Sequence, residues 1–310
     1  FELLWGSCMM SRLNGVEIED TFAELFEMWT GRVLVTANNE KWALKAAEVA
    51  TGFASSIIGS PAEAGIEGTL PPGRTPDGRV GALIQIYHQT RRDLKRQMIE
   101  RIGQCVMTCP TTAAFNALLE AKRRLKIGRS LRFFGDGFQK RDEMFGRRVW
   151  RVPVMEGEFI VEESFGVKKA VAGGNFLILA GDVKSGLSAA EAAAAAIRQN
   201  VNGVILPFPG GICRSGSKIG SLRYKLRAST NHLYCPKLRK IVSDSQIPDS
   251  VNCVYEIVIN GLSLDSVEKA MAVGIKAAAE TPGVVKISAG NYGGKIGPIQ
   301  VRLHKILELS

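Results

Sequence analysis

Residues 253–297, CVYEIVINGLSLDSVEKAMAVGIKAAAETPGVVKISAGNYGGKIG, decide the fold that we expect for this chain. The apolar run 253–259 predicts a strand, 265–281 predicts a helix with one apolar face, and 284–287 predicts a strand before a glycine-rich loop. One residue departs from the apolar run, because Glu256 lies in its middle. An ionised, unpaired carboxylate there costs several kcal/mol, so Glu256 is expected to be either paired or kept neutral for a function.

The same order of secondary-structure elements is expected twice. Strands are expected at 32–36, 54–58, 82–87 and 105–108 in the first half, and at 175–180, 201–206, 253–259 and 284–287 in the second. Helices are expected at 39–52, 90–102, 188–199 and 265–281, the third of them opened by a capping box at Ser188. Each half has the order β-α-β-β-α-β. We therefore expect an α+β protein with two ferredoxin-like lobes and antiparallel sheets.

Residues 129–166 depart from this pattern, since short apolar and polar alternations there surround glycine turns. We interpret them as β-hairpins that join the two lobes. The chain is then divided into 11–158, an N-terminal lobe with the connecting hairpins, and 159–310, a C-terminal lobe. The chain starts at Phe1 without the features of a signal peptide, and we interpret its first residues as an artificial or upstream extension before a natural start near Met10.

The repeated pattern has a geometric consequence. Right-handed β-α-β crossovers place the four strands of a lobe in the order 4-1-3-2, with antiparallel neighbours. In the C-terminal lobe, this order predicts that the loop 173–175 meets the loop 288–294, although the two are far apart in the sequence. Glu256 is then expected on a central strand, and 208–211 at the opposite end of the sheet.

Composition limits the possible functions. The formal net charge of +10 at pH 7 favours anionic substrates, nucleic acid or an acidic partner. No apolar run approaches the roughly 18–20 residues of a membrane helix, so we expect no membrane contact. The cysteine usage favours a cytoplasmic location. The cysteines and histidines show no metal-ligand spacing, and no metal site is predicted. We interpret the cysteines as buried or idle thiols in a reducing cytoplasm; they are Cys8, Cys105, Cys109, Cys213, Cys235 and Cys253.

Glu256 is the first candidate for a catalytic residue. Strand alternation places its side chain on one face with Val254, Val258 and Asn260. If that face is covered, desolvation raises the pKa of the carboxyl and leaves a proton donor near neutral pH. A structural ion pair with one of the many arginines is the alternative. Glu63, which follows an expected strand, is a second candidate carboxylate.

Two kinds of loop supply candidates for substrate binding. Glycines permit a ligand to approach the backbone, and the polar side chains between residues 212 and 252 suit hydrogen bonding to a polar ligand. The substrate-binding set is Gly174, Asn175, Gly210, Gly211, Ser215, Ser217, Lys218, Ser229, Thr230, Asn231, Asn291 and Lys295. Ordinary tight turns and a solvated surface loop are the alternatives. The loop around Lys295 is not a phosphate loop, because Ile296 stands where that motif requires Ser or Thr.

Twelve motifs follow one another along the chain. They are NGVEIEDTFAE (14–24), PAEAGIE (61–67), TPDGR (75–79), GQCVMTCPT (103–111), FFGDGFQ (133–139), EGEFIVEESFG (156–166), AGGNF (172–176), PFPGGI (207–212), SGSKIGS (215–221), ASTN (228–231), VYEIVINGL (254–262) and GVVKISAGNYGGKIG (283–297). In this order they resemble the formylmethanofuran:tetrahydromethanopterin formyltransferase family, over about residues 13–307.

The resemblance implies an activity and a site. The activity is reversible transfer of a formyl group between the amine of methanofuran and N5 of tetrahydromethanopterin, both of them substrates, with no metal or prosthetic group. The family's proposed catalytic glutamate corresponds to Glu256, in the motif YEIVING. Formyl transfer between amines passes through a tetrahedral oxyanion, so it needs a proton donor and close placement of the two amines. A neutral Glu256 meets the first requirement.

The resemblance also implies partners. The family forms homo-oligomers, commonly tetramers, and its bacterial members are subunits of a formyltransferase/hydrolase complex. TCPTTAAF, WRVPVMEGEF and GGICRSGSK are similar to the bacterial branch, whereas PAEAG is similar to the archaeal enzyme, so both branches stay open.

Two alternative functions belong to other classes. In the first, the chain is mainly an assembly subunit of such a complex and not a self-sufficient enzyme. In the second, it is a basic RNA-binding protein. RNA-binding modules with this fold carry a basic and aromatic motif on their central strands. No run of this chain matches that motif, and the expected central strand carries an acid instead, so no nucleic acid is expected as a partner.

The positive net charge predicts electrostatic recruitment of the substrates. The resemblance implies a methanofuran with several carboxylates and a pterin with a phosphate. Raising the ionic strength from about 0.01 M to about 1 M shortens the range of electrostatic attraction from about 30 Å to about 3 Å. Steady-state kinetics over this range should therefore give rising KM values, and KM values independent of salt would contradict recruitment by charge.

Overall fold

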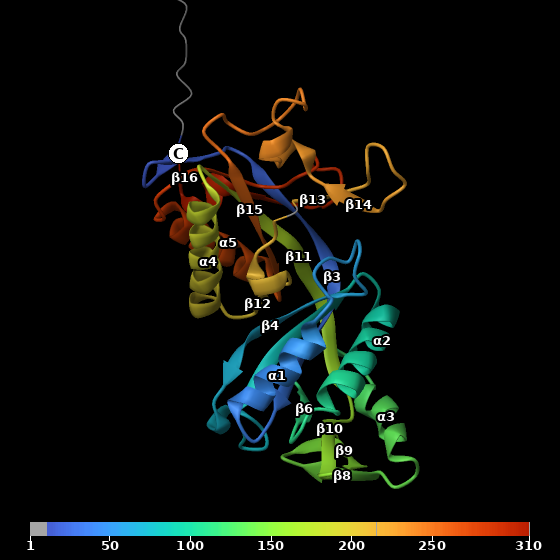
Figure 1. Cartoon of the computed structure of the whole chain (residues 1–310). Coiled ribbons are helices and arrows are strands. Elements are labelled where there is room, and N and C mark those ends of the chain that lie inside the picture. Colours follow the sequence, from blue (N-terminus) through green and yellow to red (C-terminus); the bar gives the residue numbers. More distant parts are fainter. Residues whose placement is uncertain (1–10, 215, 310) are drawn as a thin grey trace, which may run out of the picture.

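The computed structural model describes residues 11–214 and 216–309 (Figure 1). The proposed N-terminal extension, Cys8 and Ser215 lie outside these residues. The elements of the N-terminal half are β1 (Arg12–Leu13), β2 (Val16–Ile18), β3 (Phe22–Thr36), α1 (Glu40–Thr51), β4 (Glu63–Leu70), β5 (Gly81–His88), α2 (Arg91–Arg101), β6 (Ala113–Asn116), β7 (Arg123–Leu125), α3 (Ile127–Leu131), β8 (Lys140–Met144), β9 (Arg147–Val154) and β10 (Gly157–Glu162). Those of the C-terminal half are β11 (Phe165–Ala180), α4 (Val183–Asn200), β12 (Val204–Ile205), β13 (Ser217–Ile219), β14 (Ala228–Thr230), β15 (Cys253–Gly261), α5 (Leu264–Ala279), β16 (Val284–Ser288), β17 (Ile299–Arg302) and α6 (Leu303–Leu307).

Four strands in each half pair in the expected order. In the N-terminal half the order is β6-β3-β5-β4, and every neighbouring pair is antiparallel. In the C-terminal half it is β16-β11-β15-β12, again with antiparallel neighbours. Glu256 therefore lies on a central strand, β15, as the sequence predicts.

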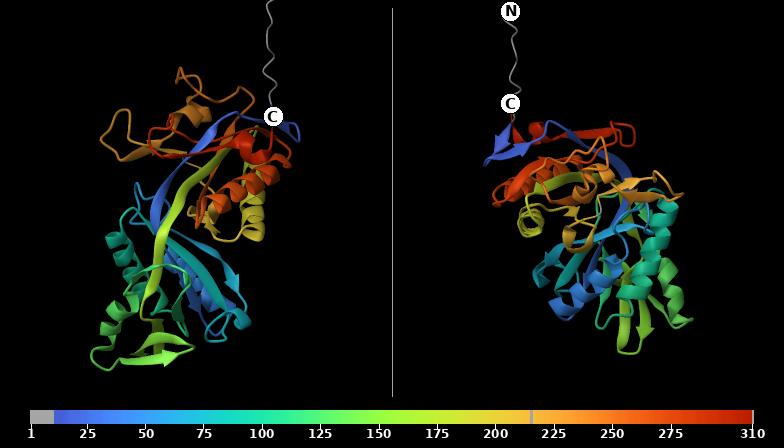
Figure 2. Two further views of the ribbon diagram at one scale, coloured as in Figure 1. Left: turned by 180° about the vertical axis from the view of Figure 1, so that it is seen from behind. Right: turned by 45° about the horizontal axis from the view of Figure 1, so that its top comes forward.

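The two halves share one mixed sheet, so the prediction of antiparallel sheets is wrong for the whole molecule. β3 and β11 are long strands that run through both halves, and they pair with each other from Phe26↔Ala172 to Gly31↔Val167 (Figures 1 and 2). Further strands extend the sheet with parallel pairs, β10 on β6 and β16 on β2. The sequence pattern did not reveal this join, because the expected strands 32–36 and 175–180 covered only one end of each long strand.

The predicted position of the hairpins is also wrong. β8, β9 and β10 do form antiparallel pairs, but β10 attaches to β6 at the far end of the N-terminal half, away from the C-terminal half (Figure 1). The first expected hairpin segment instead forms α3 and a 3₁₀ turn, Arg132–Gly135. Gly128 permits this arrangement, because a Cβ on Gly128 would lie 2.2 Å from the carbonyl oxygen of Glu162 on β10.

Three local predictions are corrected by the structure. Residues 54–58 form a loop, closed by the hydroxyl of Ser60, which donates to the carbonyl of Ser56 at 2.6 Å, and the strand β4 follows it. Residues 105–108 continue helix α2 through a π-helical turn, and the strand comes later as β6. Helix α4 begins after Asp182, whose carboxylate accepts from the backbone N–H of Ser185, and not at Ser188.

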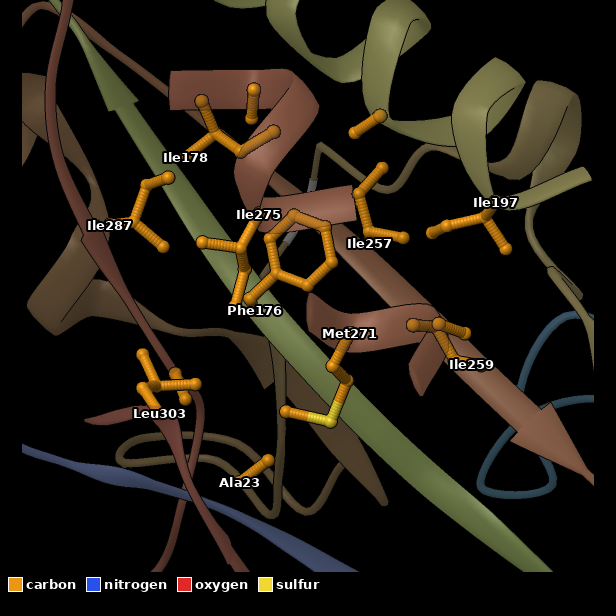
Figure 3. Close-up of a cluster of buried hydrophobic side chains, with 14 of the residues drawn as sticks. Ala23, Phe176, Ile178, Ile197, Ile257, Ile259, Met271, Ile275, Ile287 and Leu303 are labelled. Carbon is orange, nitrogen blue, oxygen red and sulfur yellow. The ribbon is translucent and has the colours of Figure 1, made fainter. Parts of the chain in front are cut away.

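The helices of the C-terminal half cover one face of its sheet. Ile257 and Ile259 of β15 are fully buried in a cluster with Phe176 of β11, Met271 of α5 and Ile197 of α4 (Figure 3). Because side chains alternate along a strand, Glu256 and Val258 of β15 point to the opposite face, as the sequence predicts. That face carries Glu256 and is free of α4 and α5.

No helix of the described residues is long and apolar enough to cross a membrane.

The start of β11 offers a test of the close packing in this sheet. A Cβ on Gly166 would lie 2.2 Å from the carbonyl oxygen of Leu118, whereas a Cβ on Gly68 of β4 would meet no atom within 4 Å. Gly166→Ala should lower the free energy of unfolding by about 1–3 kcal/mol through overpacking. Gly68→Ala is the matched control and should change it little. Equal melting temperatures for the two variants would contradict this packing.

Candidate active site

A cavity of about 530 Å³ opens on the face of the C-terminal sheet that carries Glu256. Its floor is formed by β11 and β15, with Leu177 and Val258 beside the carboxylate. Its walls come from three places: the first residues of β3 and the loop 55–58 in the N-terminal half, the polar loop between β12 and β15, and the glycine loop after β16. The cavity therefore lies where the two halves of the chain meet.

Glu256 is held in place by strands on both sides. Leu177 of β11 is its partner in the ladder, and on the other side its backbone exchanges two hydrogen bonds of 2.8 Å with Cys213. Its side chain is partly exposed to the cavity. Removal from bulk water raises the pKa of the Glu256 carboxyl to about 7, and a hydrogen bond with Cys213 acts in the opposite direction. No cation among the described residues lies within 4.0 Å of this carboxylate, so the ion pair that the sequence left open is not observed.

The two loops that the sequence predicted to meet do meet. The side-chain amide of Asn175 donates to the carbonyl of Gly290 at 3.1 Å and accepts from the N–H of Gly290 at 2.6 Å. It also donates to the carbonyl of Gly173 at 3.0 Å. A Cβ on Gly290 would lie 3.8 Å from Glu256 Oε1, so this amide fixes the backbone that lines the space next to the carboxylate.

Glu24 of β3 holds the glycine loop after β16. One carboxylate oxygen accepts from the backbone N–H groups of Tyr292 and Gly294, at 2.7 and 3.1 Å, and the other accepts from those of Ile296 and Gly297. Burial opposes ionisation of Glu24, but the four N–H donors outweigh it and lower the pKa of the carboxyl. A charge of the N-terminal half therefore shapes a wall that belongs to the C-terminal half.

Glu63 also connects the two halves of the chain through hydrogen bonds. Its buried carboxyl accepts from the N–H of Ile57 at 2.9 Å and from the side-chain amide of Asn260 at 2.6 Å. Asn260 in turn accepts from the N–H of Gly173 at 3.1 Å. Desolvation raises the pKa of Glu63, although both hydrogen bonds favour the charged form.

The structure brings part of the predicted set to the cavity. Asn175, Asn231 and Asn291 line it together with Glu256 and the second candidate carboxylate, Glu63. The side-chain amides of Asn175 and Asn291 form hydrogen bonds within the protein. Those of Asn175 are described above, and Asn291 donates to Thr21 and Phe22 and accepts from Gly293. Asn231 has no side-chain partner among the described residues, so its amide is available to a ligand.

Other predicted residues lie outside the lining of the cavity. These are Gly174, Gly210, Gly211, Lys218, Ser229, Thr230 and Lys295. Ser215 lies outside the described residues, and the side chain of Ser217 is not described. Gly174 has a packing reason to be glycine, because a Cβ there would lie 2.3 Å from Val267 Cγ1 of helix α5.

The sequence missed Glu24 and two tyrosines of the lining. The hydroxyl of Tyr292 accepts from the N–H of Ile219 at 3.2 Å, and that of Tyr234 lies 3.4 Å from Ser288 Oγ. Glu24 occurs in the motif NGVEIEDTFAE, which is the one signal that would have led to it. Within 11–214 and 216–309, no group of three or more His, Cys, Asp or Glu side chains could hold a metal ion.

Two family models match the chain over nearly its full length. The model of formylmethanofuran-tetrahydromethanopterin formyltransferase matches residues 11–154, and that of the proximal lobe of the same enzyme matches residues 157–306. The formylmethanofuran--tetrahydromethanopterin formyltransferases of Methanocaldococcus jannaschii and Methanopyrus kandleri are each 56% identical to it. They cover 96% and 95% of this chain, respectively, and 99% of their own length is matched in both cases.

Two solved structures share the fold. The formyltransferase of Methanosarcina barkeri superposes with a TM-score of 0.91 at 51% identity, over 95% of this chain and 99% of that one. A chain of the formyltransferase/hydrolase complex of Methylorubrum extorquens, solved in complex with methylofuran, superposes with a TM-score of 0.90 at 45% identity, over 96% and 99% of the two chains.

Glu24→Gln tests how the glycine loop is held. An amide offers one acceptor oxygen in place of two, so at least one pair of N–H donors loses its partner. Hydrogen exchange of the backbone amides of 292–297 should become faster in this variant. In the wild type, the same loosening should appear as the pH falls through the lowered pKa of Glu24, because protonation removes the charge that the N–H groups bind.

The matched control is Glu27→Gln. Glu27 lies on the same strand and also lines the cavity, but its side chain is exposed. Its substitution should leave exchange in the loop unchanged. Equal exchange rates in both variants and the wild type would show that Glu24 does not hold the loop.

Proposed function

The chain belongs to the formylmethanofuran–tetrahydromethanopterin formyltransferase family, and we propose that its reaction takes place in the cavity around Glu256. It is a formyltransferase that moves a formyl group between formylmethanofuran and tetrahydromethanopterin. The observation that carries the proposal for the site is Glu256 itself, a carboxyl with a pKa of about 7 that opens to a cavity.

The chemistry explains why such a carboxyl is useful. The amine nitrogen of the acceptor attacks the formyl carbon, and the electron pair of the C=O bond moves to oxygen to give a tetrahedral intermediate. Glu256 in its neutral form gives its proton to that oxygen, which removes the developing charge in a site of low dielectric. When the C=O bond forms again, the bond to the donor nitrogen breaks and the proton returns to Glu256. The proton of the attacking amine is transferred to the departing nitrogen, so atoms and charge balance.

The neighbours of Glu256 divide into two roles under this proposal. Asn175 acts as a positioning residue, because all its amide contacts are made to Gly173 and Gly290. Asn231 is the substrate-binding residue that the geometry supports, since its amide lines the cavity without a described partner. The remaining predicted residues stay proposals for contacts with the substrates; they are Gly174, Gly210, Gly211, Ser215, Ser217, Lys218, Ser229, Thr230, Asn291 and Lys295.

The family also supports proposals for the lobes, the location and the assembly of this chain. We propose two ferredoxin-like lobes, 11–158 and 159–310, joined by β3 and β11. The strand order in each half supports two lobes, and the two family models divide at 155–156, close to the proposed boundary. In space the N-terminal lobe also takes up β10, which crosses that boundary and pairs with β6. A cytoplasmic location and a homotetramer follow from the resemblance. Assembly with other subunits is supported by the relative found in a formyltransferase/hydrolase complex.

Substitution of Glu256 by Gln tests the role of the carboxyl. Gln keeps the shape but cannot release a proton, so kcat for formyl transfer by the isolated chain should fall roughly 10²-fold or more. In the wild type, the donating form is lost as the pH rises through about 7, so kcat should decline at higher pH, by about tenfold per pH unit once the carboxyl is largely ionised. Glu256→Gln should abolish this decline.

The control for this experiment is Glu280→Gln, an exposed carboxylate after helix α5, which should behave as the wild type. Near-normal turnover of Glu256→Gln would refute the role of the carboxyl. An isolated wild-type chain without any formyl transfer would favour the alternative of an assembly subunit.

A further inference from the structure

Helix α3 and the hairpin β8–β9 lie at the far end of the N-terminal half (Figure 1). A second cavity, of about 600 Å³, is lined by residues of these elements. It shares no lining residue with the cavity around Glu256. Six cationic side chains line it: Arg124, Lys126, Arg129, Arg132, Arg141 and Arg148. Formyl transfer, as proposed above, makes no use of this site.

The cations are only partly neutralised. Among the described residues, Glu163 is the one carboxylate in the lining, and it pairs with Arg141 at 3.2 Å. Arg124 lies 3.7 Å from a carboxylate oxygen of Glu162. For Lys126, Arg129 and Arg148, the structure has no carboxylate within 4.0 Å in the part of the chain that it describes. Like charges gathered in a hollow repel one another, and their combined field attracts an anion.

A neutral donor adds to this field. Trp150 lines the cavity, and its indole N–H is buried without a hydrogen-bond acceptor among the described residues. The guanidinium of Arg132 lies 5.2 Å from the centre of the Trp150 ring and 4.0 Å from that of Phe133, so the aromatic rings hold this arginine in place. A buried donor without an acceptor is destabilising, and an oxyanion in the cavity would satisfy it.

We propose that this cavity binds a compact oxyanion with several negative charges, bearing phosphate or carboxylate groups. The guanidinium group of an arginine can donate two parallel hydrogen bonds to a phosphate or a carboxylate group. A cavity of about 600 Å³ is large enough for a small molecule. The unpaired cations Lys126, Arg129 and Arg148 supply the charge, and Trp150 supplies the additional donor.

Calorimetric titration of the full chain with two probes, tripolyphosphate and citrate, tests the proposal. The variant Arg129→Gln/Arg148→Gln removes two cations that have no described partner, so the fold should be preserved. Each lost charge-assisted contact weakens binding markedly, and we expect the Kd to rise at least about tenfold. Arg74→Gln/Arg92→Gln is the matched control, since it removes the same charge from two exposed arginines outside the cavity.

The outcomes distinguish specific binding in this cavity from nonspecific attraction of anions to a positively charged protein. Binding of either probe that is weakened by the cavity pair and not by the control pair supports the proposal, and the tighter probe identifies phosphate or carboxylate as the preferred group. Trp150→Phe should also weaken that binding, because it removes the N–H and keeps most of the ring. No binding of either probe, or equal losses in the two pair variants, would overturn the proposal.

Discussion

The pairing of β3 with β11 is the constraint on which the rest of the structure depends. Each strand is long enough to serve two lobes: β3 pairs with β5 and β6 at one end and with β17 at the other, while β11 pairs with β7 and then with β15 and β16. A backbone ladder between them leaves the two halves little freedom to move apart, because each would have to break main-chain hydrogen bonds. Residues of β3 and β11 line the cavity around Glu256, so this ladder holds the two sides of the cavity together.

Three of the glutamates that line the cavity have three different environments. Glu24 is surrounded by backbone N–H donors, which lower its pKa and make it an anchor for the glycine loop. Glu63 is buried with an amide partner and ties a loop of one half to a strand of the other. Glu256 is desolvated, with no cation within 4.0 Å among the residues that the structure describes, and it opens to the cavity, so its pKa of about 7 suits proton donation. The same functional group thus has a different pKa shift at each position, and its neighbours set the direction of that shift.

Much of this arrangement was accessible from the sequence. The repeated β-α-β-β-α-β pattern gave the strand order in each half, and the order correctly predicted that Asn175 and Gly290 lie together. The join of β3 and β11 was missed because hydrophobic periodicity describes a strand and its faces, not its partners. The role of Glu24 was missed for a similar reason, since its donors lie in a loop more than two hundred residues away in sequence. Gly174 stays a proposal for substrate binding, and the absence of a side chain there also permits the close packing of α5.

Proton donation by Glu256 requires a carboxyl that is still partly protonated near pH 7 in the wild-type protein. Infrared difference spectra of the wild type minus Glu256→Gln, recorded from about pH 5 to about pH 9, isolate the carbonyl band of this one protonated carboxyl. The structure predicts a band that is present at the acid end and disappears with a midpoint of about pH 7. Its absence at pH 5, which would mean a carboxylate with an ordinary pKa, would contradict proton donation by Glu256.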